Sequence, residues 1–345
     1  MKISNQDRFS FPVLLIFFGI SVCVFILCVC LGSVMVPLGD TLAVIRNAIA
    51  RAPQPELSAV PIILNVRLPR VLCVFLTGAS LAICGAAMQG LLRNSLADGS
   101  TLGVSTGASL GAALAIVFGF NVPSLPFAGT MIMAIIFAFL SLMIILTLAY
   151  RLDYSLSTNT IILLGVIFSM FVSSILSLVI TFASDKVKNI VFWTMGSLSG
   201  SSYANAIVLF VVLMICGTVL MSLSRELNAF AIGEEEARHI GVPIRRVKLM
   251  VLITVSVLIG VCVSIGGSIG FVGLVTPHMV RLITGPNHKK LMVACLLGGG
   301  TFLMLCDLTA RMLLRPVELP LGVVTSLIGA VVFVFIYANS REVKR

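Results

Sequence analysis

Residues 225–248 read RELNAFAIGEEEARHIGVPIRRVK and form the only long polar interruption in a mostly apolar chain. The stretch holds four of the 13 acidic residues and five basic residues, and a long apolar segment lies on each side of it. Because unpaired polar groups are costly in lipid, such a stretch lies in water or against another protein. The pattern predicts membrane spans on either side of a polar surface element.

The residues of this stretch predict a short helix, a turn and a second helix. Gly233 precedes three glutamates, and negative charge is favourable at a helix N-terminus. Glu234 and Arg238 are four positions apart, in the favourable order for a helix-surface ion pair. Gly241 supplies a helix stop, and Pro243 suits the first turn of a helix that continues into the next span.

The composition excludes a soluble protein. Hydrophobic residues make up 59% of the 345 residues and charged residues only 10%, whereas soluble domains carry about 25% charged residues. Since a span needs about 20 apolar residues, roughly ten spans fit and leave no room for a soluble domain. We therefore expect an all-α, polytopic membrane protein with about ten transmembrane helices and a single domain, residues 1–345.

Ten apolar segments are the candidate spans. They lie near residues 11–36, 68–91, 101–120, 127–149, 156–182, 203–223, 247–265, 269–283, 291–312 and 320–338. The first is too long for the core of a signal peptide, and we interpret it as a retained span. The eighth is short and glycine-rich, which favours a half-crossing.

The basic residues predict the orientation in the membrane. With the N-terminus inside, 15 of the 23 basic residues fall in inside segments and 8 in outside segments. Because basic residues are enriched in cytoplasmic loops, both termini and residues 225–248 should be cytoplasmic. The basic residues lie at span ends rather than in one patch, which argues against nucleic-acid binding despite a net charge of +10.

Small residues recur in the second and third spans, at spacings that let helices approach closely in lipid. They are Gly78, Ala82, Ala86 and Gly90, and then Gly103, Gly107 and Gly111. Ser105 also completes a Gly-x-Ser-x-Gly pattern typical of serine hydrolases. That chemistry requires a strand–turn–helix elbow and a partner histidine, so the position in a membrane helix disfavours it.

The fifth span carries a stripe of hydroxyl side chains, Ser169, Ser173, Ser177 and Thr181. Such hydroxyls can bond back to their own helix, which would make them simple packing residues. A stripe of this length also suits the wall of a water-filled translocation path. The sequence leaves both interpretations open.

Other chemistry has little support. The nine cysteines lie almost entirely within apolar runs and form no CxxC pair, which favours packing, and the three histidines lack metal-ligand spacing. No GxxxxGK[ST] phosphate loop occurs, so any ATP that drives the protein is bound by another chain. Asp98 and Asp307 lie towards span ends, and the scarcity of buried acids argues against an ion-driven transporter.

Six motifs follow one another along the chain. They are Arg67-Leu-Pro-Arg70; Gln89-Gly-Leu-Leu-Arg-Asn94 with Leu96-Ala-Asp98; Leu102-Gly-Val-Ser105 with Gly107-Ala-Ser109; Gly233-Glu-Glu-Glu-Ala-Arg238; Gly270-Phe-Val-Gly-Leu-Val275 with Pro277-His278 and Arg281; and Glu318-Leu-Pro320 with Gly322-Val-Val-Thr325. In this order they resemble the FecCD family, the membrane permeases of ATP-binding-cassette (ABC) importers for ferric siderophores, haem and cobalamin. The resemblance extends from about residue 67 to residue 338.

The resemblance implies a type II ABC importer permease with ten helices in the bacterial cytoplasmic (inner) membrane. It implies a second permease subunit, identical or homologous, two cytoplasmic ATPases that bind the ATP, and an external binding protein. The chain itself would bind no cofactor or metal and would catalyse no covalent step. Ferric siderophore is the family's commonest cargo, and haem and cobalamin are the alternatives.

The resemblance also implies site residues. It places the ATPase-coupling element between the sixth and seventh spans, where the candidates are Gly233, Glu234, Glu235, Glu236, Arg238 and Gly241. Arg67, Arg70 and Arg311 match in position the arginines with which family members receive acidic residues of the binding protein, unless they reach lipid headgroups instead. An ion-driven secondary transporter and a hydrolase using Ser105 are the alternatives from other classes.

Overall fold

The computed structural model describes residues 11–54, 59–120, 128–154 and 156–342, and these ranges contain helices and connecting loops without a β-strand. The helices are α1 (Phe11–Cys30), α2 (Leu38–Ala50), α3 (Ala59–Pro61) with a π-helical turn (Ile62–Arg67), α4 (Leu68–Leu91), α5 (Val104–Phe118), α6 (Ala128–Leu152), α7 (Thr158–Phe182), α8 (Val187–Thr194), α9 (Tyr203–Ser222), α10 (Ser224–Ile232), α11 (Glu234–His239), α12 (Ile244–Gly266), α13 (Val272–Thr284), α14 (His288–Met312) and α15 (Leu321–Glu342). The predicted all-α fold is confirmed.

Each of the ten predicted spans coincides with a helix, namely α1, α4, α5, α6, α7, α9, α12, α13, α14 and α15. Within the described ranges, seven helices are long and apolar enough to cross a membrane, and α5 is a shorter apolar helix. Helix α13 has 13 residues and rises only about 20 Å, which is too short to cross a hydrocarbon core of about 30 Å alone. The first span ends earlier than predicted, at Cys30.

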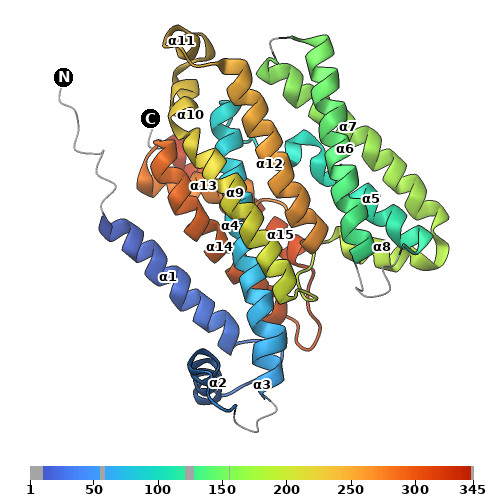
Figure 1. Ribbon diagram of the computed structural model, residues 1–345, viewed down its shortest axis with the longest axis vertical. Coiled ribbons are helices and arrows are strands. Elements are labelled where there is room, and N and C mark those ends of the chain that lie inside the picture. The colour runs from blue at the N-terminus through green and yellow to red at the C-terminus, as the bar shows by residue number, and fades with distance from the viewer. Residues whose placement is uncertain (1–10, 55–58, 121–127, 155, 343–345) are drawn as a thin grey trace.

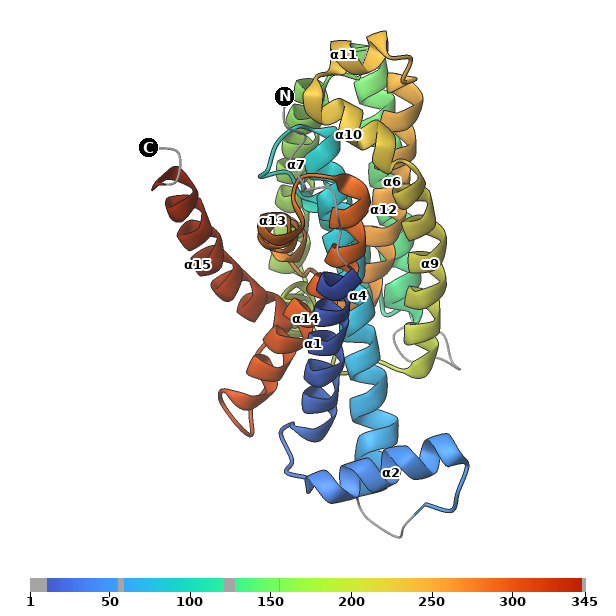
Figure 2. The ribbon, with the colours of Figure 1, turned by 90° about the vertical axis from the view of Figure 1, so that its left-hand side faces the viewer.

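The long helices run between two opposite ends of the molecule (Figures 1 and 2). Helices α10 and α11 lie at one end, and α2 and α3 lie at the other. Helix α2 lies across the direction of α4 in Figure 2, and the sequence analysis did not predict it. It exposes Leu38 and Leu42, as an amphipathic helix at a membrane interface does.

Helix α4 is the packing centre, and almost all of its residues are buried. A Cβ atom added to Gly78 would overlap the carbonyl oxygen of Gly299 in α14, and one added to Gly85 would overlap that of Gly273 in α13. The backbones are therefore in direct contact at these glycines. The packing role is confirmed for Gly78, one of the predicted small residues, whereas Gly85 was not predicted.

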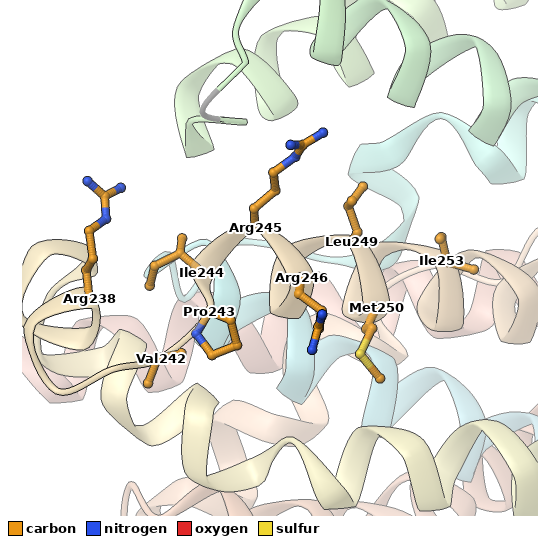
Figure 3. A pocket seen from close by; sticks show the side chains of 9 residues that line it. All are labelled: Arg238, Val242, Pro243, Ile244, Arg245, Arg246, Leu249, Met250 and Ile253. Carbon is orange, nitrogen blue, oxygen red and sulfur yellow. The ribbon is translucent and has the colours of Figure 1, made fainter.

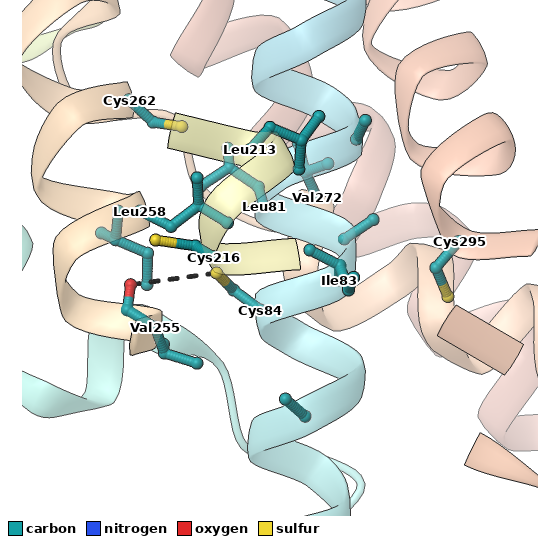
Figure 4. Close-up of a cluster of buried hydrophobic side chains, with 14 of the residues drawn as sticks. Leu81, Ile83, Cys84, Leu213, Cys216, Val255, Leu258, Cys262, Val272 and Cys295 are labelled. Carbon is teal, nitrogen blue, oxygen red and sulfur yellow. Dashed lines mark hydrogen bonds between the residues drawn. The ribbon is translucent and has the colours of Figure 1, made fainter. Parts of the chain in front are cut away.

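The cysteines belong to this core. Eight of the nine are buried and all are free; the exception to burial is Cys23. Cys84, Cys216 and Cys262 lie among the side chains of Leu81, Leu213 and Leu258 (Figure 4), and Cys84 Sγ contacts the carbonyl oxygen of Val255 at 3.8 Å. The interpretation of the cysteines as small packing residues is confirmed for these positions.

The segment after α8, the end of α12 and the start of α15 meet in one place. Their backbone groups form hydrogen bonds with each other. The N–H of Ser197 donates to the carbonyl of Gly266 at 2.8 Å, and the N–H of Leu321 donates to the carbonyl of Gly196 at 2.9 Å. Gly196 and Gly267 have φ angles of 74° and 68°, which glycine adopts without strain. Such internal pairing is what allows non-helical backbone inside a membrane protein.

The positions of α11 and α2 at opposite ends give a test of orientation. We predict that a cysteine at Glu235, in a background with Cys23→Ser, is protected from a membrane-impermeant thiol reagent in intact cells. A cysteine at Arg46 in α2 should be labelled from outside, since Arg46 is exposed at the other end. In inverted vesicles the two accessibilities should exchange. Labelling of the Glu235 position in intact cells would contradict the predicted topology.

Candidate functional site

Helix α10 fixes the beginning of the polar stretch to the membrane helices. Its side chains Leu227 and Phe230 are 0% and 1% exposed. The side-chain oxygen of Asn228 accepts a hydrogen bond from the backbone N–H of His288 at 2.8 Å and lies 2.8 Å from His288 Nδ1. Because His288 begins α14, the stretch is tied to a long core helix and is not a free loop.

Glu234, the first residue of α11, holds the side chain of Lys248 in α12. The two carboxylate oxygens accept hydrogen bonds from Lys248 Nζ at 2.9 and 2.8 Å. The same ammonium group donates to the carbonyl oxygen of Leu156 at 2.8 Å. Lys248 is 1% exposed, so one buried charge joins α11, α12 and the connection between α6 and α7.

The predicted surface pair of Glu234 with Arg238 is wrong. An exposed pair four residues apart contributes only about 0.2–0.5 kcal/mol. A bidentate, charge-assisted contact with a buried ammonium is stronger, and breaking it leaves an uncompensated charge. Glu234 therefore pairs with Lys248, and Arg238 stays exposed on α11.

Gly241 ends α11 as predicted. Its φ angle is 87°, its N–H donates to the carbonyl of Arg238, and the N–H of Val242 donates to the carbonyl of Ala237, both at 3.0 Å. This left-handed turn satisfies two carbonyl groups at the helix end. A Cβ atom on Gly241 would meet no atom within 4 Å, so the requirement for glycine comes from the backbone angle and not from crowding.

The outer side of α11 is open to solvent. Glu235, Glu236 and Arg238 are exposed, and Ile232 and Ile240, on either side of the helix, are 69% and 70% exposed. Two large apolar side chains beside an exposed charged helix are typical of a surface that another protein covers. The sequence analysis identified the charged residues but missed the two isoleucines.

The three arginines expected at the outer surface are buried instead. Arg67, Arg70 and Arg311 are 4%, 6% and 3% exposed. Arg67 donates hydrogen bonds to the backbone carbonyls of Val29 and Cys30 at 2.9 and 2.6 Å. Its charge is thereby used to fix the end of α1.

Asp307 joins Arg70 and Arg311 into a buried arginine cluster. Its Oδ1 accepts from Arg70 Nε and Nη2 at 3.0 and 2.9 Å, and its Oδ2 forms an ion pair with Arg311 Nε at 2.9 Å. Arg70 also bonds Glu318 at 2.8 Å. The guanidinium groups of Arg67, Arg70 and Arg311 are thus engaged within the chain, and their assignment to docking of the binding protein stays a prediction.

The hydroxyl stripe lies on an open face of α7. Ser173, Ser177 and Thr181 are exposed, and Ser169 is half-buried. Ser177 Oγ donates to the carbonyl of Ser173 at 3.0 Å, and Thr181 Oγ1 donates to that of Ser177 at 2.9 Å. The expected back-bonding is present, and the polar stripe is nevertheless open to whatever lies beside α7.

A cavity of about 730 Å³ lies around α8, which follows the end of α7 away from α11. Its wall includes Lys186, Asn189, Trp193 and Glu318. Since Glu318 also bonds Arg70, this cavity borders the buried charge cluster. It combines polar and aromatic side chains, as small-molecule entrances do.

The sequence profile of the FecCD transport family matches residues 19–339. The chain belongs to the FecCD transport family. In this FecCD chain α10 and α11 lie between the sixth and seventh of the ten predicted spans, which are α9 and α12. The buried arginine cluster connects α1, α4 and α14, and the chain is an ABC importer permease with an all-helical membrane fold.

Three relatives of the FecCD chain show the range of the family. It is 41% identical over 284 residues to the ABC transporter permease YvrB of Bacillus subtilis, covering 81% of this chain and 80% of that protein. It is 37% identical to the molybdate import permease MolB of Haemophilus influenzae, covering 81% and 82%. It is 36% identical to the hemin transport permease HmuU of Yersinia pestis, covering 81% and 84%.

A solved structure supports the fold. It is described as an inward-facing conformation of a metal-chelate type ABC transporter. The TM-score is 0.84 at 31% identity, and the match covers 95% of the FecCD chain and 99% of the solved chain.

The Glu234–Lys248 contact gives a test of how α11 is held. We predict that Glu234→Gln lowers the apparent melting temperature of the purified permease, because breaking a buried pair costs about 3–5 kcal/mol. Adding Lys248→Met should restore much of the loss by removing the unpaired ammonium. Glu235→Gln, on the exposed side of α11, is the matched control and should change little. Equal effects of Glu234→Gln and Glu235→Gln would contradict the role of the contact.

Proposed function

We propose that the chain is the membrane-spanning permease of an importer for an iron chelate, with ferric siderophore as the cargo. It works with a second permease, two cytoplasmic ATPases that bind and hydrolyse ATP, and a binding protein on the opposite face. The chain binds no cofactor of its own, forms one domain and resides in the bacterial cytoplasmic membrane with both termini inside.

The observation that carries this proposal is the attachment of the exposed helix α11. Its charged outer side and the flanking isoleucines, Ile232 and Ile240, are free to contact an ATPase. Its inner side is fixed to α12 and to the α6–α7 connection through Glu234 and Lys248. The coupling residues are Gly233, Glu234, Glu235, Glu236, Arg238 and Gly241. A displacement of α11 by the ATPase would be transmitted to two spans.

The translocation path forms between two permease copies, along the hydroxyl stripe Ser169, Ser173, Ser177 and Thr181 of α7. In the isolated chain three of these four residues are exposed, which leaves the stripe available to line a shared passage. Leu327, Val331 and Val334 of α15 are 66%, 71% and 67% exposed at helical spacing. This apolar face is where α15 meets the second permease.

The choice of cargo has support from the relatives and from the chemistry of the chain. Relatives are named for hemin, molybdate and cobalamin import, all of which carry a metal, and the solved structure is named for a metal chelate. The described residues contain no group of three or more metal-ligating side chains. The described part of the chain therefore suits a metal that travels already enclosed in a chelate.

The first test of the proposed function concerns coupling at Gly241. Gly241→Val should lower uptake and stimulated ATPase activity about tenfold or more, because a β-branched residue in the left-handed region costs on the order of 1–3 kcal/mol. Gly241→Asn is the matched control, since asparagine tolerates this conformation. Full transport by Gly241→Val would show that the turn is not part of the coupling element.

The second test concerns cargo. Cells that depend on this transporter should take up radioactive iron as a ferric siderophore, and unlabelled siderophore should compete. Haemin, cobalamin and molybdate should leave the uptake unchanged. Competition by one of these three, with no siderophore uptake, would reassign the cargo while leaving the permease function intact.

A further inference from the structure

An open groove runs along α12 beside α11, with a volume of about 770 Å³ (Figure 3). Its lining residues share one face of α11, the turn and α12. They are Arg238, Val242, Pro243, Ile244, Arg245, Arg246, Leu249, Met250 and Ile253. Neither the coupling element nor the translocation path uses this surface of α12.

The groove is basic at one end and apolar at the other. Arg238, Arg245 and Arg246 lie at the end near α11, and none of the described lining residues is acidic. Met250 and Ile253 follow along α12 and are 39% and 44% exposed. The groove thus has positive charge at the start of the span α12 and an apolar surface further along the same helix.

Arg245 is held in place by aromatic side chains of the neighbouring α6–α7 region. Its guanidinium lies 4.7 Å from the ring of Tyr150 and 4.4 Å from the ring of Tyr154. Arg245 Nη1 also donates a hydrogen bond to the Tyr154 hydroxyl at 2.8 Å. Stacking on the two rings fixes the planar guanidinium group of Arg245 and leaves some of its N–H groups free to donate. Such an arginine is suited to binding a phosphate group.

The apolar surface continues towards the middle of the span. A smaller hollow of about 70 Å³ lies between α6 and α12 and includes Ser256, Val257 and Gly260. Leu249, Ile253 and Gly260 recur at helical spacing, so both hollows follow one stripe of α12. The stripe rises about 16 Å, close to the thickness of about 15 Å of one leaflet's hydrocarbon region.

We propose that this groove is a binding site for an anionic phospholipid of the leaflet next to α11. The arginines bind the headgroup phosphate, and one acyl chain lies along the α12 stripe towards the hollow between α6 and α12. Basic pockets between membrane helices on the cytoplasmic side recognise anionic lipids in this way. The length of the apolar stripe favours a lipid over a free anion, which would use only the basic end.

The position of the groove supports a lipid as the occupant. Helices α9 and α12 lie on one side of the molecule and α15 on the opposite side (Figure 2). If α15 faces the second permease, α12 faces the bilayer. Because Arg238 belongs to α11, a bound lipid would also contact the coupling helix. The site itself is independent of the cargo, and it shares Arg238 with the proposed coupling element.

The experiment places a fluorescent probe in the apolar part of the groove. The only tryptophan, Trp193, is replaced by Phe, and Ile253→Trp introduces the probe into the full chain. The protein is reconstituted into phosphatidylcholine vesicles containing brominated phosphatidylglycerol or brominated phosphatidylcholine. Brominated phosphatidylglycerol should quench with at least about fivefold higher apparent affinity, since each basic residue contributes about 1 kcal/mol.

Variants then identify the groups responsible. The double variant Arg245→Gln with Arg246→Gln should bring the ratio of the two apparent affinities, phosphatidylglycerol over phosphatidylcholine, close to one. Arg225 is an exposed arginine of α10 outside the groove, so Arg225→Gln should leave this ratio unchanged. Phospholipid retained per permease after mild detergent purification, counted by mass spectrometry, is the second readout. It should fall in the same double variant and also in each single variant, so a misfolded double variant leaves the site testable.

Several results would overturn the proposal. One is equal quenching by brominated phosphatidylglycerol and brominated phosphatidylcholine when the arginines of the groove are intact. Another is a preference for phosphatidylglycerol that persists in the double variant. Loss of the preference in inorganic phosphate, but not in chloride of equal ionic strength, would identify a free-anion site instead. Loss of quenching on addition of the partner ATPase would identify a protein contact.

Discussion

The close contact of helix backbones at glycine is the constraint on which the rest of this structure depends. Inside a bilayer the hydrophobic effect does not drive helices together, so association relies on packing and internal hydrogen bonds. Gly78 and Gly85 bring α4 against α14 and α13 with no room for a Cβ atom. The remaining helices surround this centre, and a side chain at either glycine would separate the very elements that carry the polar contacts.

The buried charges follow from that packing. Asp307 lies between Arg70 and Arg311, and a cluster of this kind is stable only when helix positions keep every charge paired. Three of the eight basic residues that the sequence predicts to lie outside, Arg67, Arg70 and Arg311, serve internal contacts. They are therefore not part of the exposed surface charge.

The sequence predicted the spans well because apolar length and small-residue spacing are local properties. The same is true of α11 and its turn at Gly241, which depend on neighbouring residues alone. The contacts that sequence reasoning missed join distant positions: Glu234 with Lys248, and Arg70 with Asp307. Spacing along one helix favoured Arg238 as the partner of Glu234, and only the folded arrangement brings a buried ammonium closer. The exposed pair Ile232 and Ile240 was hidden by the general abundance of isoleucine.

The single ammonium group of Lys248 has a mechanical consequence. It attaches α11 near the start of α7, where it bonds the carbonyl of Leu156, while the hydroxyl stripe ends near the far end of α7. A 25-residue helix acts as a rigid lever about 37 Å long. A tilt of about 5° at the attached end would move the far end by roughly 3 Å, within the range of helix shifts in switching proteins. In the proposed orientation, a small displacement of α11 on the cytoplasmic side would change the width of the proposed passage on the other side of the membrane.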